Sequence, residues 1–249
     1  MRAEWNAEPM ALLSVLAGDG GMEDGNGLGA ANRAEFVRQG VVAVNLMGAP
    51  GSGRTRLVEA TARALDGHRT GVLLAGRAVE AEAWRLGQAG VPAHTIPSRG
   101  CHVDAGDVDV ALQEFAWRYL DYLFVENVGG LVSPARHTLG ETARVVTLAL
   151  PDGAELPLKY PDVFRSADLV VVTKADLLPF LPHVSLDAIA ESLACVMRRP
   201  AFVVTSAFTG RGLAPWITWL ERSRRGLCGE PARRPAAALE AADPVLVLA

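Results

Sequence analysis

The stretch at residues 48–55, GAPGSGRT, matches the phosphate-binding pattern G-x-x-x-x-G-K-S/T except that Arg54 stands where the pattern has lysine. In such a loop the backbone N–H groups and the following helix N-terminus face phosphate oxygens, and the last hydroxyl, here that of Thr55, binds Mg²⁺. The other loop residues that we expect at the nucleotide are Gly48, Gly51, Ser52 and Gly53. A glycine-rich turn between a strand and a helix is also common without a ligand, so the loop alone leaves both interpretations open.

Two later segments carry residues that can recognise guanine. In TKAD, the Asp176 carboxylate can accept hydrogen bonds from two N–H groups on one edge of guanine, a pair that adenine lacks, while the Lys174 stem lies along the base. In TSA, Ser206 and Ala207 form a turn that closes over the base from the other side. Each segment alone is also typical of an ordinary surface turn. Three such segments in this order, each at the carboxyl end of an expected strand, predict a guanine-nucleotide site.

The segment ENVG follows another expected strand and supplies a carboxylate and, three residues later, a glycine. Glu126 can hold Mg²⁺ through water, and the backbone N–H of Gly129 can approach the γ-phosphate. Together with Arg54, these two are the candidate catalytic residues. The alternative is a strand followed by a glycine turn. Because the phosphate loop, TKAD and TSA occur in the same chain, we favour the functional interpretation.

The spacing of apolar residues indicates the elements that position these segments. From residue 41 onward, short apolar runs alternate with amphipathic helical stretches. Strands that are apolar on both faces and separated by helices are typical of a mostly parallel sheet covered on both sides. We therefore predict an α/β fold, a three-layer P-loop NTPase. The expected strands are residues 41–48, 70–76, 122–129, 144–151, 168–174 and 201–207.

The chain divides into a flexible N-terminal arm at 1–31, a P-loop GTPase domain at 32–226 and a low-order Ala/Pro-rich tail at 227–249. The formal net charge of −4 predicts no nucleic-acid or anionic membrane partner, and no apolar run is long enough to span a bilayer. The three cysteines lie far apart, which argues against a disulfide framework and for a reducing, cytoplasmic setting.

Residues 32–212 resemble the hydrogenase nickel-incorporation GTPases, the HypB family. The resemblance rests on the phosphate loop and on GCHVDA, ENVGGLVSPA, LGE, LKYPDVF, ADLVVVTKADLLPFL and TSAFTGRGL. The combination of CH before DA, ENVG and KYP distinguishes this family from the related urease GTPases. The resemblance implies a GTPase that uses GTP and Mg²⁺ and forms a GTP-promoted homodimer with Ni²⁺ or Zn²⁺ at the interface. It also implies that hydrogenase maturation proteins and the large subunit of nickel–iron hydrogenase are its partners.

The pair Cys101 and His102 matches the metal segment of that family. Two adjacent side chains point in divergent directions, so one pair cannot enclose an ion, but two copies related by a two-fold axis can supply Cys₂His₂ to Zn²⁺ or Ni²⁺. The family has a second cysteine where this chain has Ser133, whose neutral hydroxyl is a poorer ligand than a thiolate. We therefore expect a weaker site, completed by water or by His137. The alternative for the pair is a buried cysteine beside a partly exposed histidine.

Two cations stand where the family has other residues. Arg54 replaces the loop lysine, and its wide planar fork fits a phosphate cradle less well than a compact ammonium group. Arg77 follows Gly76 where the family has an aspartate near Mg²⁺, and Glu82 lies close to a second acidic position of the family pattern. Because catalysis depends on tight placement, we expect nucleotide binding to survive these changes better than turnover.

Three functions remain open from the sequence. The leading one is a slow GTPase metallochaperone that assists nickel insertion during hydrogenase maturation. The second is a hydrolysis-deficient scaffold or regulatory dimerisation partner that responds to guanine nucleotide. The third is an interaction protein that has lost nucleotide, which the intact TKAD and TSA segments disfavour.

Overall fold

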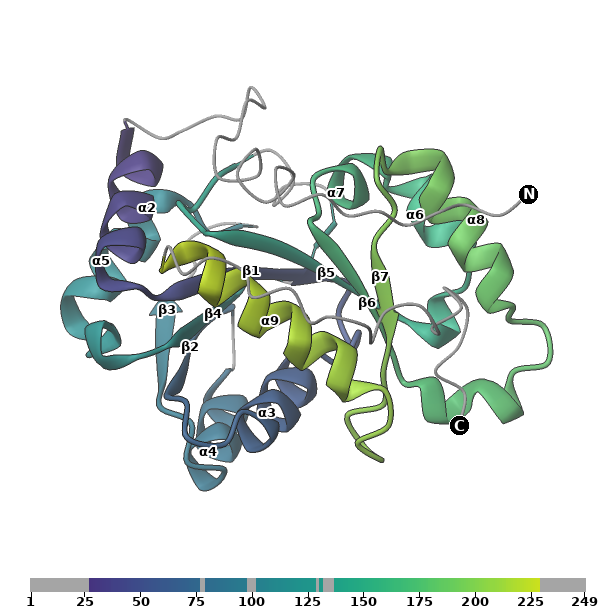
Figure 1. The fold of residues 1–249 in the computed structure, drawn as a ribbon, viewed down its shortest axis with the longest axis horizontal. Helices are drawn as coiled ribbons and strands as arrows, with labels where there is room; N and C mark the ends of the chain where they lie inside the picture. The colour runs from purple at the N-terminus through teal and green to yellow at the C-terminus, as the bar shows by residue number, and fades with distance from the viewer. Residues whose placement is uncertain (1–26, 77–78, 98–101, 129, 132–136, 229–249) are drawn as a thin grey trace, which may run out of the picture.

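The computed structural model describes residues 27–76, 79–97, 102–128, 130–131 and 137–228. The centre of this part is a sheet of seven parallel strands in the order β3-β2-β4-β1-β5-β6-β7 (Figure 1). The strands are β1 (Val42–Gly48), β2 (Thr70–Gly76), β3 (Ala93–Pro97), β4 (Tyr122–Glu126), β5 (Ala143–Ala149), β6 (Leu169–Thr173) and β7 (Phe202–Val204). Because the strands are parallel, their carboxyl ends share one edge of the sheet, where a ligand site is expected.

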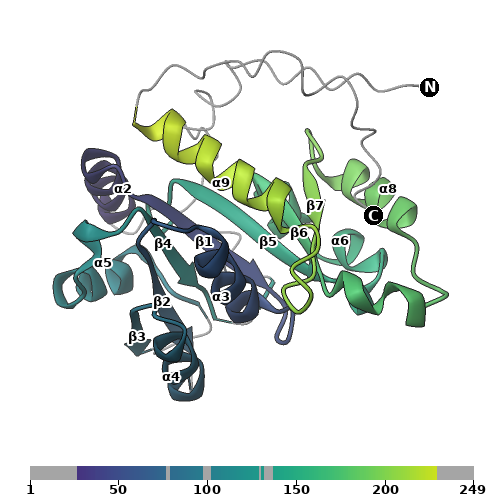
Figure 2. The same cartoon turned by 60° about the horizontal axis from the view of Figure 1, so that its bottom comes forward.

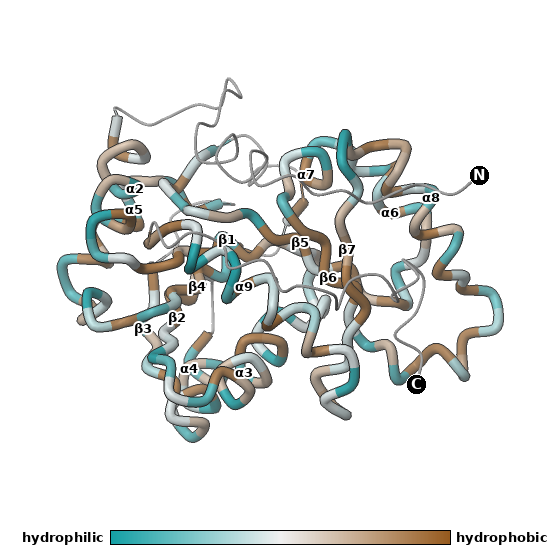
Figure 3. Tube along the Cα trace, viewed as in Figure 1, coloured by the Kyte–Doolittle hydropathy of each residue, from teal (hydrophilic) through white to brown (hydrophobic). Residues whose placement is uncertain are grey.

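The central strands are buried on both faces, as the sequence predicts. Every residue of β1, β4, β5 and β6 is buried, and Val44, Phe124 and Val171 have no exposed surface. Figure 3 shows hydrophobic residues concentrated along these strands. Two-sided burial of parallel strands requires a layer of helices on each face.

One face of the sheet is covered by α3 (Arg54–Ala64), α4 (Glu80–Gln88) and α9 (Leu213–Leu227), and Figure 2 shows α9 and α3 on the same side. Leu57 of α3 and Trp216 of α9 are completely buried against it. The indole N–H of Trp216 donates to the Thr61 hydroxyl at 2.7 Å, so this buried polar atom is satisfied.

In the described part of the chain, the other face is covered by α2 (Leu28–Gln39), α5 (Ala105–Glu114), α6 (Glu155–Lys159), α7 (Pro161–Arg165) and α8 (Leu186–Val196). The first two pack with the 3₁₀ turn η2 (Trp117–Tyr119) on one half of the sheet, where Phe36 meets Trp117 edge to face at 5.2 Å. The other three pack on the second half around Phe164 and Leu193. Two further 3₁₀ turns are η3 (Leu150–Asp152) and η4 (Ala175–Phe180). The predicted three-layer α/β fold is confirmed.

Five of the six expected strands are shorter than the sequence expectation, and one strand was not expected. β4 stops at Glu126, β5 stops at Ala149 and β7 is only three residues long. The unexpected strand is β3 at the edge of the sheet, a short segment containing a histidine and ending in proline. The predicted arm and tail lie almost entirely outside the described residues and stay predictions. Within the described ranges no helix is both long and apolar enough to cross a bilayer.

Candidate functional site

The loop at 48–55 joins the end of β1 to the start of α3, at the centre of the sheet. Its backbone requires glycine at three positions. A side-chain Cβ at Gly48 would lie 2.2 Å from the Thr147 hydroxyl oxygen, and Gly51 and Gly53 adopt φ of 77° and 87°, in the left-handed region that favours glycine. Within the described residues no side chain caps the start of α3, so its N–H groups are left to a ligand or water.

Ser52 anchors this loop to the two neighbouring strands. Its hydroxyl lies 2.7 Å from that of Thr147 on β5, and its carbonyl accepts a hydrogen bond from the Thr173 hydroxyl at the end of β6, at 2.6 Å. Its own N–H donates to the Ala49 carbonyl at 3.0 Å, so in this structure the predicted phosphate donor is used within the loop. Ser52 is 1% exposed, and its hydrogen bonds to Thr147 and Thr173 fix the loop on the ends of β5 and β6.

Glu126 and Thr55 meet at the end of β4, beside the loop. The Thr55 hydroxyl donates to Glu126 Oε2 at 2.9 Å. Glu126 is 6% exposed, and its Oε1 is buried with no hydrogen-bond partner among the described residues. Burial raises the pKa of Glu126, while the charge of Arg54 and the Thr55 hydrogen bond oppose that shift. A buried, unpartnered carboxylate oxygen beside a hydroxyl is a donor set that fits hydrated Mg²⁺.

The side chain of Arg54 turns toward the same end of β4. Its guanidinium donates to the backbone carbonyl of Asn127. Burial lowers the pKa of Arg54, and the charge of Glu126 partly restores it. The loop cation is therefore held by protein groups, next to the carboxylate that fits Mg²⁺.

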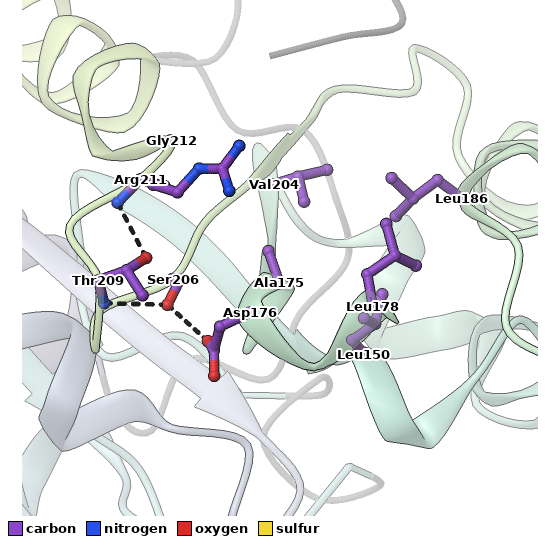
Figure 4. Close-up of a pocket in the computed structure, with 10 residues that line it drawn as sticks. All are labelled: Leu150, Ala175, Asp176, Leu178, Leu186, Val204, Ser206, Thr209, Arg211 and Gly212. Atoms are coloured by element: carbon purple, nitrogen blue, oxygen red, sulfur yellow. Dashed lines mark hydrogen bonds between the residues drawn. The ribbon is translucent and has the colours of Figure 1, made fainter. Parts of the chain in front are cut away.

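The residues expected to read the base are also brought together. Asp176 Oδ1 accepts from the Ser206 hydroxyl at 2.5 Å, and Ser206 Oγ accepts from the Thr209 N–H at 3.2 Å (Figure 4). Lys174 has φ of 60° and is the single non-glycine residue with positive φ in the described ranges. Such backbone strain persists where the surroundings fix it and is frequent at functional sites.

A cavity of about 220 Å³ opens beside this pair. Figure 4 shows Asp176 and Ser206 on one side of it, with Leu178, Leu186 and Val204 along the other. A flat, mostly apolar ligand with a polar edge fits a pocket of this composition. Ala207 follows directly in the adjoining turn and is half-buried.

Of the remaining predicted residues, Arg77, Cys101, Gly129 and Ser133 lie outside the described residues. Glu82 lies in the first turn of α4, where its charge raises the pKa of Glu126. His102 is described and stacks on His137, with the ring centroids 4.3 Å apart and the planes 3° from parallel. The structure therefore brings together two histidines from the segments assigned to metal.

The sequence missed a buried polar network that joins these parts, formed by Asn45, Asn127, Glu141 and Arg144. Asn127 Nδ2 donates to Asn45 Oδ1 at 3.5 Å, and Asn45 Nδ2 donates to Glu141 Oε1 at 3.2 Å. The Arg144 guanidinium donates to Glu141 at 2.5 Å. An asparagine in the otherwise apolar strand at 42–48 was the available signal, because a buried amide needs partners.

A glycine loop between a buried strand and a helix, on a parallel sheet with a carboxylate ending the neighbouring strand, defines a P-loop nucleotide-binding protein. A family model described as "CobW/HypB/UreG, nucleotide-binding domain" matches residues 42–202. The chain belongs to this family, and relatives at 34% and 35% identity, of which it covers more than two thirds, place it among the HypB proteins.

The hydrogenase maturation factor HypB of Rhizobium leguminosarum bv. viciae is 41% identical over 196 residues, 78% of this chain and 65% of the relative. The hydrogenase/urease maturation factor HypB of Helicobacter hepaticus is 34% identical over 197 residues, 77% of this chain and 81% of the relative. The chain thus spans less than two thirds of the Rhizobium protein, and 64% of the HypB of Azotobacter chroococcum mcd 1.

Two solved HypB structures share the fold. The structure from Helicobacter pylori in complex with nickel has a TM-score of 0.75 and 28% identity, covering 80% of this chain and 94% of that one. The structure from Archaeoglobus fulgidus has a TM-score of 0.73 and 31% identity, covering 80% of this chain and 98% of that one.

Proposed function

We propose that this chain binds GTP with Mg²⁺, hydrolyses it slowly and acts as a nickel metallochaperone in hydrogenase maturation. The observation that carries the proposal is the link between the phosphate loop and the base-reading turn. Thr173 at the end of β6 holds the carbonyl of Ser52, and the residue after Thr173 begins the turn that contains Asp176. One nucleotide can therefore place its phosphates on the loop and its base against Asp176.

The polar atoms of the site suit the two ends of that nucleotide. The N–H groups of Gly51, Gly53 and the first turn of α3 bind phosphate oxygens. Asp176, oriented by Ser206 at 2.5 Å, accepts the paired N–H groups that guanine has and adenine lacks. Thr55 and Glu126 hold Mg²⁺, which when bound neutralises charge on the phosphate oxygens.

Slow turnover follows from the placement of Arg54. Its guanidinium donates to the Asn127 carbonyl in this structure, so an N–H group that serves a phosphate belongs to a side chain already held at the end of β4. A planar guanidinium also demands more room than the ammonium group of lysine. Misplacement of a catalytic group by about 1 Å can cost roughly a hundredfold in rate.

The metal role and the partners extend the proposal to the whole protein. Several relatives are named as hydrogenase maturation factors, and one solved HypB structure is a complex with nickel. We assign Ni²⁺ or Zn²⁺ to Cys101 and His102 of two protomers in a GTP-promoted homodimer. The dimer would act in the cytoplasm with hydrogenase maturation proteins and the large subunit of nickel–iron hydrogenase.

A second function, a guanine-nucleotide-dependent scaffold that hydrolyses little, is favoured by one observation. The cation of the loop already donates to the Asn127 carbonyl and lies near the charge of Glu126. A cation held in this way can help to bind the nucleotide without stabilising the transition state of hydrolysis.

Phosphate release from GTP by the purified chain with Mg²⁺ separates the two functions, with ATP as the control. Slow release from GTP and none from ATP supports the GTPase. Tight GTP binding with no release beyond the uncatalysed rate supports the scaffold. Absence of guanine-nucleotide binding would remove both.

A further inference from the structure

We propose that Thr173 is a positioning residue for the nucleotide. Its hydroxyl fixes the distance between the phosphate loop and the base-reading turn, so that both ends of one guanine nucleotide bind together. The inference rests on the guanine-nucleotide site of the proposed function and names the side chain that joins the two halves of that site.

The Thr173 hydroxyl reaches the phosphate loop from the end of β6. It donates to the carbonyl of Ser52 at 2.6 Å, across 121 positions of the chain. Thr173 is 3% exposed and Ser52 is 1% exposed, so bulk water has little access to this bond. A Cβ built on Gly53 would lie 3.6 Å from the same hydroxyl oxygen. The hydroxyl therefore holds the loop at the point where its backbone enters α3.

The base-reading turn follows Thr173 directly and is itself held in place. The N–H of Ala175 donates to the Thr205 carbonyl at 3.0 Å. One residue later, Asp176 Oδ1 accepts from the Ser206 hydroxyl at 2.5 Å (Figure 4). The carboxylate that we assign to guanine is therefore fixed to the end of β6, three residues after the threonine that holds the loop.

The sheet does not join the phosphate loop to this turn directly. The loop follows β1 and the turn follows β6, and β5 lies between these two strands. Ser52 also contacts β5, where its hydroxyl lies 2.7 Å from that of Thr147. Among the hydrogen bonds of the described residues, the one from Thr173 alone joins residues 48–55 to residues 169–180. This hydroxyl is therefore the direct link between the two halves of the site.

A fixed distance matters because GDP spans both halves. Once the base is bound, the diphosphate is presented to the loop at a high effective concentration, provided that the two subsites match the separation of the two ends. If the loop shifts relative to the turn, this advantage is lost. A ligand that fills only one half does not depend on the distance. Loss of the Thr173 hydroxyl should therefore weaken binding of GDP more than binding of either half.

The test compares GDP with its two halves, guanosine and pyrophosphate, on the full chain. Competition for a fluorescent GDP analogue gives the affinity for GDP, and chemical-shift titration gives the affinities for the halves. The variant Thr173→Val keeps the branched shape of the side chain and removes the hydroxyl, whereas Thr173→Ser keeps the hydroxyl. If Thr173→Val does not fold, Thr173→Cys, whose thiol is a weak donor, takes its place.

The matched control is Thr142→Val, at the opposite edge of the sheet. It removes a buried hydroxyl that donates to the Ala43 carbonyl at 3.0 Å, far from both nucleotide loops in strand register. The unfolding midpoint of each variant checks that the fold is retained.

We expect Thr173→Val to weaken GDP binding by about tenfold and to change the affinities for guanosine and pyrophosphate by less than about twofold. Thr173→Ser and Thr142→Val should bind all three ligands as the wild type does. Unchanged GDP affinity in Thr173→Val would overturn the inference. An equal loss for GDP and for one of its halves would also overturn it, because Thr173 would then act on that half alone.

The outcome separates this inference from the proposed function. If the wild type and Thr173→Val bind GDP equally well, the guanine-nucleotide site stands and Thr173 does not position it. If the wild type binds no GDP, the proposed function fails and the inference fails with it.

Discussion

The guanidinium of Arg54 donates a hydrogen bond to the backbone carbonyl of Asn127, across the space between the phosphate loop and the end of β4. Asn127 also belongs to the buried polar network, since its side-chain oxygen accepts from the N–H of Val103 at 3.2 Å. Asn127 thus contacts both Arg54 of the phosphate loop and the backbone of Val103, the residue after His102. A phosphate oxygen can be served by the other N–H groups of the same guanidinium or in exchange for this bond.

Restoring lysine in the loop should raise turnover more than affinity. In Arg54→Lys the compact ammonium group can sit deeper in the cradle, so we expect GTP hydrolysis to rise about ten- to a hundredfold with little change in GDP affinity. Single-turnover hydrolysis at saturating protein measures this. The control is Arg56→Lys, whose side chain is 63% exposed on α3. Equal rates for Arg54→Lys and wild type would show that the arginine does not limit hydrolysis.

Glu126 should govern the Mg²⁺ dependence of nucleotide binding. The neutral amide in Glu126→Gln cannot replace the buried carboxylate as a partner for the ion, so the gain in GTP affinity on adding Mg²⁺ should fall by about tenfold. Affinities measured with Mg²⁺ and with a chelator give this ratio. Glu82→Gln removes a charge that lies near Glu126, and it should alter the ratio less. The prediction fails if Glu126→Gln keeps the wild-type ratio.

Gly48→Ala should destabilise the fold strongly. Its Cβ would lie 2.2 Å from the Thr147 hydroxyl oxygen and 2.8 Å from the Thr147 carbonyl oxygen. Steric overlap and an unfavourable φ together should lower the free energy of unfolding by roughly 2–4 kcal/mol. Urea denaturation measures this change. Gly87→Ala, in α4 with no heavy atom within 4 Å of the added carbon, should be neutral or stabilising. Similar results for both variants would contradict the close packing at Gly48.

Asp168 should make stability depend on pH in the acidic range. Burial raises the pKa of Asp168 to about 6, while its hydrogen bond from the Arg144 N–H at 2.7 Å acts in the opposite direction. Because the pKa of Asp168 in the folded state lies above the unfolded value of about 3.9, the folded state stays protonated to a higher pH than the unfolded state. Stability therefore falls as pH rises from about 4 to about 6, by at most about 3 kcal/mol.

The variant Asp168→Asn isolates this contribution. An amide oxygen can still accept from the Arg144 N–H but carries no titrating proton. The difference in unfolding free energy between wild type and variant should change between pH 4 and pH 6 and level off above that range. A constant difference across the range would show that Asp168 does not titrate there.

Local patterns predicted the phosphate loop and the base-reading turn. In each, a few neighbouring residues have fixed conformational needs, as with Gly51 and Gly53, whose φ is positive. The sequence placed Asp176 and Ser206 after strands of one parallel sheet, and the hydrogen bond between the two is a finding of the structure. Alternating strand and helix patterns likewise sufficed for the three-layer fold.

The features that the sequence missed depend on residues far apart in the chain. Asn45 on β1 meets Glu141 only after β1 and β5 pair, so no local pattern reveals the bond. The stacking of His102 on His137 arises in the same way. The edge strand β3 was missed because it is short and its apolar residues do not alternate clearly.

The measurement that tests the central claim most directly is competition for a fluorescent GDP analogue by GDP, GTP, ADP and ATP. The Asp176→Asn variant is measured in parallel. We expect GDP and GTP to displace the analogue from wild type, and ADP and ATP to fail. In Asp176→Asn one of the two acceptor oxygens becomes an NH₂ group that faces a guanine N–H, so GDP affinity should fall about a hundredfold or more. Displacement by adenine and guanine nucleotides alike, or no binding of the analogue, would contradict a guanine-nucleotide site.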